Sequence, residues 1–227
     1  MIPRFNVDID PEIPGEAAFW MPDPDDLAGD DGIGYFHNTW NLGEVTREEA
    51  LEVIEQERTI LDLVELLAIG VQEYEQVCSA MEYNDPAALP ERFSERVGSD
   101  AIIETVGDPS SSEPNFGCLE LGVAGLSFAL ATVGCVPAAS CRSHFEKHSW
   151  SSCPVVYLAA DRKQAAWLQP LVQRAGCGFG IDEERPEFLL IMAPSIRQTA
   201  ELAELILATA APAGGEGPAV DGQDRLW

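Results

Sequence analysis

Apolar residues recur every three or four positions after residue 50, which is the spacing of one buried face of an α-helix. The preceding segment, Thr46-Arg47-Glu48-Glu49, has the form of a capping box, in which the Thr46 hydroxyl accepts from the Glu49 amide and Glu49 reaches back. We therefore predict an amphipathic helix from about 46 to 81, either continuous or broken near Gly70. Its expected core-facing positions are Leu51, Ile54, Leu61, Val64, Leu67, Val71, Tyr74 and Val77.

The second half of the chain alternates between strand and helix patterns. Short apolar runs bounded by glycine, proline or charged residues predict strands, and longer amphipathic runs predict helices. In chain order we expect a helix at 118–133, strands at 135–141 and 154–160, a helix at 162–175, strands at 177–181 and 187–193, and a last helix from about 195. Strands joined without a helix pair antiparallel or in a mixed sheet. The predicted fold is α+β: an N-terminal helical part followed by a two-layer α/β sandwich with a mixed or antiparallel sheet.

Composition divides the chain into four parts. Residues 1–35 are rich in proline, aspartate and glycine, so we expect an exposed, irregular, acidic lead-in. The helical part then covers 36–106, and the α+β domain covers 107–210, starting in a loop of proline, serine and glycine. Residues 211–227 have the low complexity of a flexible tail.

One stretch, 121–141, contains no charged residue and is long enough to cross a bilayer. Pro137, several glycines and several hydroxyl residues interrupt it, so a buried helix that leads into a buried strand explains it better. The N-terminus shows no apolar signal segment, and we expect a cytoplasmic protein without membrane attachment. In that compartment the six cysteines are expected as free thiols rather than as a disulfide framework.

Charge weighs against two classes of partner. The chain carries 39 acidic and 13 basic residues, a formal net charge of −26, which disfavours nucleic acid and anionic membranes. The acids concentrate in residues 1–100, whereas basic residues outnumber acids within 135–175. This basic surround is a place where a small anion is tolerated. It consists of Arg142, Lys147, Arg162, Lys163 and Arg174.

Two cysteines and two of the three histidines lie together in the connection between the first two predicted strands. Their spacing, Cys141-x2-His144-x3-His148-x4-Cys153, supplies four ligands of the type and number that tetrahedral zinc takes. Gaps of two and three residues let ligands converge from one turn. A zinc site is therefore one hypothesis for this segment.

Two other interpretations of the segment stay open. Cys141 could act as a catalytic or redox thiol, because the positive charges around it would lower its pKa. Cys135 or Cys153 would then serve as the resolving thiol. Alternatively, the cysteines pack as small apolar residues and the histidines decorate a loop.

The segments AASCRSH, CPVVYLAAD, AAWLQPLVQRAGCGFGID and EFLLIMAPS follow one another over about residues 136–195. Together they resemble the core of the tRNA wybutosine-synthesis methyltransferase family. In that family a serine-cysteine motif ends one strand, a partner strand follows, and a helix leads into a Gly-Phe turn and another strand. The resemblance implies mainly the fold, and by the motif match alone it implies that Ser140, Cys141 and Arg142 line a pocket.

Three functions follow as hypotheses, and they leave open whether the protein is an enzyme. The first is a binding or accessory protein that holds a small anion or a protein partner at the 140–153 loop. The residues expected to hold that ligand are Ser140, Arg142, Lys147, Arg162 and Lys163. The second is a small metal- or thiol-dependent enzyme centred on Cys141. The third is an acidic inhibitor or nucleic-acid mimic that uses the surface of residues 1–100.

Overall fold

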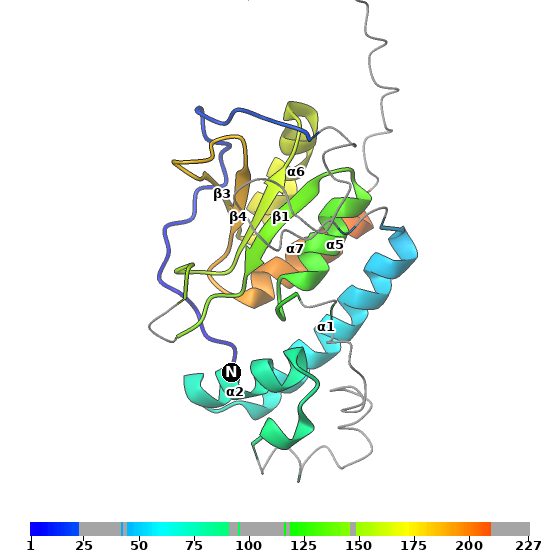
Figure 1. The fold of residues 1–227 in the computed structure, drawn as a ribbon, viewed down its shortest axis with the longest axis vertical. Coiled ribbons are helices and arrows are strands. Elements are labelled where there is room, and N and C mark those ends of the chain that lie inside the picture. Colours follow the sequence, from blue (N-terminus) through cyan, green and yellow to red (C-terminus); the bar gives the residue numbers. More distant parts are fainter. Residues whose placement is uncertain are drawn as a thin grey trace, which may run out of the picture.

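The structure of the protein, a computed structural model, describes residues 1–22, 42, 45–90, 95, 116, 119–145 and 149–209. Within them, N-terminal helices precede a four-stranded antiparallel sheet that packs against helices (Figure 1). The fold is therefore α+β, as the sequence predicts. The expected tail at 211–227 and most of the loop at 107–117 lie outside the described residues.

The long N-terminal helix pattern forms two helices. The first, α1 (Arg47–Leu67), begins at the predicted capping box, where the Glu49 amide donates to the Thr46 hydroxyl at 3.2 Å and the Thr46 amide donates to Glu49 Oε2 at 2.8 Å. The second, α2 (Val71–Glu82), starts after Gly70, whose backbone is extended (φ −155°, ψ 173°). The break thus falls where the sequence offered one, and a short 3₁₀ turn, η2 (Pro86–Ala88), follows α2.

The sheet has the strand order β1-β2-β4-β3, and all neighbouring strands are antiparallel. Its members are β1 (Val136–Cys141), β2 (Val155–Ala159), β3 (Gly178–Ile181) and β4 (Leu189–Met192). Because β1 lies at an edge, it tolerates Pro137, which cannot donate a ladder hydrogen bond, and the register shifts just after it. The connection from β1 to β2 leaves the sheet at the end where β1 finishes, and this connection carries the candidate chemistry.

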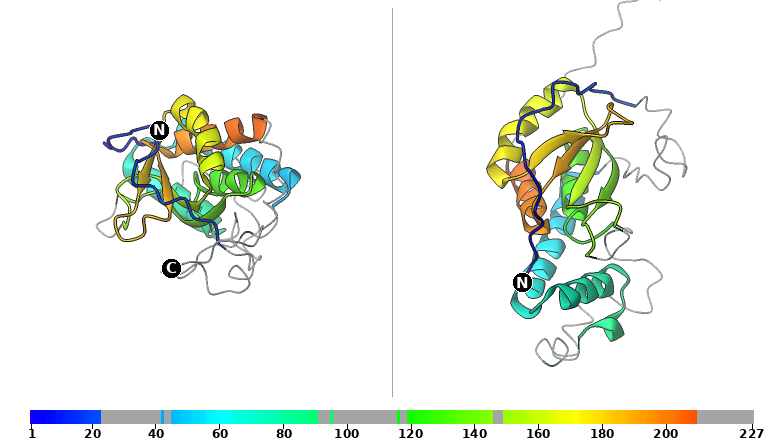
Figure 2. Two further views of the ribbon diagram at one scale, coloured as in Figure 1. Left: turned by 90° about the horizontal axis from the view of Figure 1, so that it is seen from above. Right: turned by 90° about the vertical axis from the view of Figure 1, so that its left-hand side faces the viewer.

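Three helices cover one side of the sheet (Figure 2). They are α5 (Ala124–Thr132), α6 (Arg162–Ala175) and α7 (Ile196–Ala208). The core between the layers contains alternate residues of β2 and β4, such as Val156 and Ile191, together with Leu168 and Leu202. The uncharged stretch at 121–141 forms α5 and β1, as predicted. Among the helices in the described part of the chain, none combines the length and apolarity needed to span a bilayer.

The N-terminal segment, residues 1–22, passes the outer edge of β3 and then crosses the end of the sheet (Figures 1 and 2). These residues form no helix or strand, and they are attached to the fold by backbone hydrogen bonds; the remainder of the expected lead-in, 23–35, lies outside the described residues. The Phe179 amide donates to the Asp10 carbonyl at 2.7 Å, and the Phe5 amide donates to the Pro194 carbonyl at 2.7 Å. At Gly178 an added Cβ would lie 2.6 Å from the Asp10 carbonyl oxygen, so this glycine permits the close approach.

The attachment of this segment follows from a pattern in its sequence. From Phe5 to Ile13 apolar and polar residues alternate, apart from a proline, and the even-numbered positions are exposed while the odd-numbered ones are half-buried. Alternation with a period of two is typical of an extended chain lying on a surface. The high proline and aspartate content of residues 1–35 does not reveal this alternation, which extends over only a few residues.

Candidate functional site

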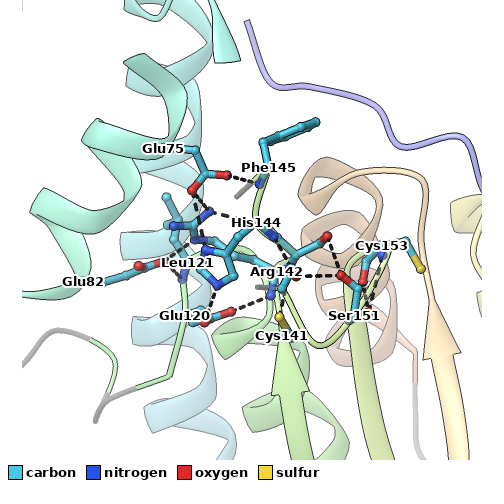
Figure 3. A network of polar contacts seen from close by, with 12 residues as sticks. Glu75, Glu82, Glu120, Leu121, Cys141, Arg142, His144, Phe145, Ser151 and Cys153 are labelled. Carbon is cyan, nitrogen blue, oxygen red and sulfur yellow. Dashed lines mark hydrogen bonds and ion pairs between the residues drawn. The ribbon is translucent and has the colours of Figure 1, made fainter. Parts of the chain in front are cut away.

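The chain turns sharply just after β1. Ser143 has a positive φ of 65°, an unusual conformation for a residue with a side chain, and its hydroxyl donates to the Ser151 carbonyl at 2.9 Å. The His144 amide then donates to the Ser149 hydroxyl at 3.1 Å. These bonds hold the turn while Arg142 points into the protein and His144 stays half-buried at its edge (Figure 3).

Arg142 is fully buried and is engaged by two glutamates of α2. Its Nε lies 2.7 Å from Glu82 Oε1, and its Nη1 lies 2.7 Å from Glu75 Oε2. Its guanidinium carbon also lies 5.8 Å from the ring centroid of Tyr74. Burial raises the pKa of the Glu82 carboxyl, while the charge of Arg142 opposes that rise. The arginine therefore neutralises internal acids and does not face an external anion.

Glu120 contacts both Arg142 and His144, and so connects the turn after β1 with a group of potential metal ligands. Its Oε2 accepts from the Arg142 amide at 2.6 Å, and its Oε1 lies 2.9 Å from His144 Nε2. Ligand atoms of Glu120, Cys141 and His144 all lie within 4.8 Å of one another. A carboxylate, a thiol and an imidazole in this arrangement could hold a metal ion.

Each of these three side chains has a second partner that fixes its orientation. The Ser143 amide donates to Cys141 Sγ at 3.3 Å, and the Arg142 amide donates to Glu120 Oε2. His144 Nδ1 lies 3.5 Å from Glu75 Oε2, on the side of the ring opposite Nε2. Such outer partners orient metal ligands and set the tautomer of a ligating histidine.

The buried thiol of Cys141 is not activated. Burial, with the nearby charge of Glu120, raises the pKa of Cys141 to about 12, so the thiol keeps its proton at neutral pH. Burial, with the nearby charge of Asp161, also raises the pKa of Cys135 to about 12. Cys153 is also buried, and its pKa is raised by burial as well. All five described cysteines are free, consistent with the expectation of free thiols.

The structure describes three of the four predicted zinc ligands and brings two of them together. Cys141 and His144 belong to the converging group, whereas Cys153 does not and Glu120 takes part instead. His148 lies outside the described residues. Glu120 was missed because it precedes α5 and is more than twenty positions from the Cys/His segment.

The expected basic surround is described only in part, because Lys147 lies outside the described residues. Arg162 and Lys163 begin α6, which follows the end of β2 away from the 140–153 connection (Figure 1). The guanidinium of Arg162 lies 4.3 Å from the ring centroid of Phe19. Ser140 is half-buried on β1. Of the basic residues predicted to hold an anion, the described ones do not come together.

Glu75 and Glu82, like Glu120, were not identified from the sequence. They are seven positions apart, so a helix places them on the same face. The sequence therefore placed both glutamates on one face of a helix. It gave no sign that Arg142, from a distant part of the chain, would contact both of them.

A cleft opens beside this network, with a volume of about 490 Å³. Its described lining residues are Gln72, Glu75, Gln76, Ser79 and His144. The four α2 residues follow the spacing i, i+3, i+4, i+7, so one polar face of the helix forms a wall. Cys141 and Arg142, implied by the resemblance to line a pocket, are both buried and are not among these lining residues.

A further buried carboxyl lies at the start of α5. Glu57 is 1% exposed, and its Oε1 accepts from the Gly122 amide at 2.7 Å. Burial raises the pKa of Glu57 to about 7, although the amides of Gly122, Gly125 and Ala124 oppose the rise. A carboxylate is a suitable cap for a helix N-terminus, but complete burial makes its charge costly.

Comparison of the chain with models of protein families, with curated proteins and with solved structures found no match.

Proposed function

We propose that this protein binds zinc, or a divalent metal of similar preference, through Glu120, Cys141 and His144. The observation that carries the proposal is the convergence of these ligand atoms within 4.8 Å of one another. Thiolate, imidazole and carboxylate are the three ligand types that zinc takes in proteins. Three protein ligands leave one tetrahedral position for water or a substrate, which is the arrangement of catalytic rather than structural zinc sites.

The local charge supports a cation at this position. The buried guanidinium of Arg142 contacts Glu75 and Glu82, and Glu120 accepts from the backbone amide of the same residue, so three glutamates share one basic side chain. With all of them ionised, the formal charge is −3 + 1 = −2, and loss of the Cys141 proton makes it −3. A divalent ion would reduce this to −1, so its binding relieves repulsion among the carboxylates.

Of the functions predicted from the sequence, this geometry favours the metal-dependent one. A thiol nucleophile is less suitable, because Cys141 is buried and its pKa is raised to about 12. An anion site at Arg142 is less suitable as well, because both of its engaged nitrogens contact glutamates.

The test is metal binding by protein that has first been stripped with a chelator. Cobalt(II) titrated into the wild-type protein should bind at about one ion per chain, with the charge-transfer absorption of a cobalt–thiolate bond. Zinc should then displace it. Cys141→Ser should abolish the thiolate absorption, and His144→Ala should weaken cobalt binding at least tenfold.

Cys153→Ser is the matched control, since it removes a second buried thiol, one that lies in the connection from β1 to β2. It should retain both the stoichiometry and the absorption of the wild type. The proposal fails if the wild-type protein binds no cobalt at micromolar concentration. It fails equally if Cys153→Ser and Cys141→Ser lose the signal to the same extent.

A further inference from the structure

The cleft on α2 differs from an ordinary apolar ligand pocket. Its volume of about 490 Å³ is in the range of small-molecule sites, but its described lining consists of polar side chains. Gln72 and Gln76 are exposed, while Glu75, Ser79 and His144 are half-buried. A ligand that fits this cleft must therefore gain its binding energy from hydrogen bonds and charge.

Two side chains of the cleft lining, Gln76 and Glu75, carry oxygen atoms that can accept hydrogen bonds from a ligand. The amide nitrogen of Gln76 donates to the Ala88 carbonyl at 2.7 Å, and the oxygen of the same amide is an acceptor for a ligand donor. Glu75 accepts from the buried Arg142 on its inner side and from the Phe145 amide at 3.0 Å. Each carboxylate oxygen has a second lone pair, so Glu75 can accept further donors from the cleft.

The charge around the cleft also favours a ligand that donates hydrogen bonds and carries a positive charge. None of its described lining residues is a lysine or an arginine, and Arg142 lies behind Glu75 with its side chain fully buried. The formal charge of the nearby glutamates and Arg142 is −2 without metal and −1 with zinc and ionised Cys141. An anion is repelled in both states, whereas a cation is attracted.

We propose that this cleft binds a small organic cation bearing a guanidinium or a primary ammonium group. Arg142 provides an example of this interaction within the protein, since its guanidinium donates to Glu75 at 2.7 Å. A ligand guanidinium would approach the same carboxylate from the cleft and would donate to Gln72, Gln76 and Ser79. The inference goes beyond the proposed metal site and stands in its absence, because none of its contacts requires a metal.

The probe is ethylguanidinium, compared with ethylurea, which is nearly the same shape but uncharged, and with propionate, which is an anion. Each is titrated into ¹⁵N-labelled full-length protein, first after treatment with a chelator and again with zinc added. Ethylguanidinium should shift the amide signals of α2 around Gln72, Gln76 and Ser79 in a saturable manner. Ethylurea should bind at least about tenfold more weakly, and propionate should not shift these signals.

Substitution separates specific binding from general attraction to an acidic protein. Gln72→Lys places an ammonium group in the cleft and should weaken ethylguanidinium binding about tenfold or more. Gln56→Lys makes the same change at an exposed position of α1 outside the cleft lining, and should alter it less than about twofold. Both sites are exposed, so both variants should fold.

Two results would overturn the inference. One is the absence of saturable shifts on α2 with ethylguanidinium in both metal states. The other is an equal loss of binding in Gln72→Lys and Gln56→Lys, which would indicate non-specific electrostatics. A protein that binds ethylguanidinium but no cobalt would support this site while removing the metal proposal, so the two failures are distinguishable.

Discussion

Arg142 donates through Nε to Glu82 Oε1 at 2.7 Å, at a point where the arginine side chain is fully buried and that of the glutamate is 9% exposed. This pair connects the turn after β1 to the end of α2. The same guanidinium reaches Glu75, which in turn contacts His144. The network therefore links the stability of the fold to the position of a candidate metal ligand.

Arg142→Met should lower the free energy of unfolding by about 3–5 kcal/mol, because it leaves the buried Glu82 carboxylate without a compensating positive charge. Urea denaturation at pH 7 measures the loss. Adding Glu82→Leu to Arg142→Met should recover part of it, since an apolar pair replaces an unpaired charge.

Arg197→Met is the matched control for this substitution. Arg197 pairs with Asp62 at 2.9 Å and with Glu65 at 2.6 Å, but its side chain is 35% exposed. The control should cost less than about 1 kcal/mol. Equal losses in the two variants would show that burial does not govern the energetics of Arg142.

Glu57 should make stability depend on pH. Its carboxyl pKa is about 7 in the folded protein against 4.5 as the ordinary value, so the folded state binds more protons between these pH values. Stability should therefore fall as pH rises from about 4.5 to 7 and change little above that. The full contribution is about 3 kcal/mol.

The readout is the difference in unfolding free energy between Glu57→Gln and the wild type. This difference should grow in favour of the variant between pH 4 and pH 8, because the glutamine cannot ionise. Glu55→Gln, at an exposed position of the same helix, should follow the wild-type pH dependence. Parallel curves for Glu57→Gln and the wild type would place the pKa of Glu57 near its ordinary value.

Metal binding should release a proton. With its pKa at about 12, Cys141 is protonated in the metal-free protein at neutral pH and must ionise to become a ligand. The apparent zinc affinity should then rise about tenfold per pH unit between pH 7 and 9. Calorimetry in buffers of different ionisation enthalpy measures the proton count, and a value near zero would exclude the thiolate as a ligand.

Gly178→Ala should detach the N-terminal segment from the edge of β3. The new Cβ would lie 2.6 Å from the Asp10 carbonyl oxygen, a backbone atom that cannot yield without moving the segment. The expected cost is about 1–3 kcal/mol, with faster proteolysis within residues 1–22. Gly180→Ala on the same strand meets the flexible end of Met192 at 3.0 Å and should change both quantities less.

The sequence predicted the elements well, because their signals are local. The Thr46 capping box, the stop at Gly70 and the alternation of strands and helices each depend on neighbouring residues. The candidate site was predicted in part: Cys141 and His144 lie in one turn, but their third partner, Glu120, comes from before α5. A contact between distant segments leaves no periodicity to detect.

The net charge of the sequence around Arg142 predicted the surroundings of this residue less well than the hydrophobic pattern predicted the helices and strands. Arg142 was expected to face a ligand because it stands in a basic stretch of sequence. In the fold its neighbours are Glu75 and Glu82 from another helix, so its environment is acidic. Net charge along a sequence window therefore describes the surroundings poorly once distant elements pack together.

The attachment of the N-terminal segment also constrains the order of events during synthesis. Phe5 bonds to Pro194, and Asp10 bonds to Phe179, so residues 1–22 dock only on segments that come much later in the chain. Until then the apolar side chains of Phe5, Val7 and Ile9 have no surface to cover. Closing so long a loop is slow, and the β3 edge stays open to other extended chains meanwhile. Residues 1–22 therefore do for the β3 edge what a further strand would do, since they occupy backbone groups with which another extended chain could pair.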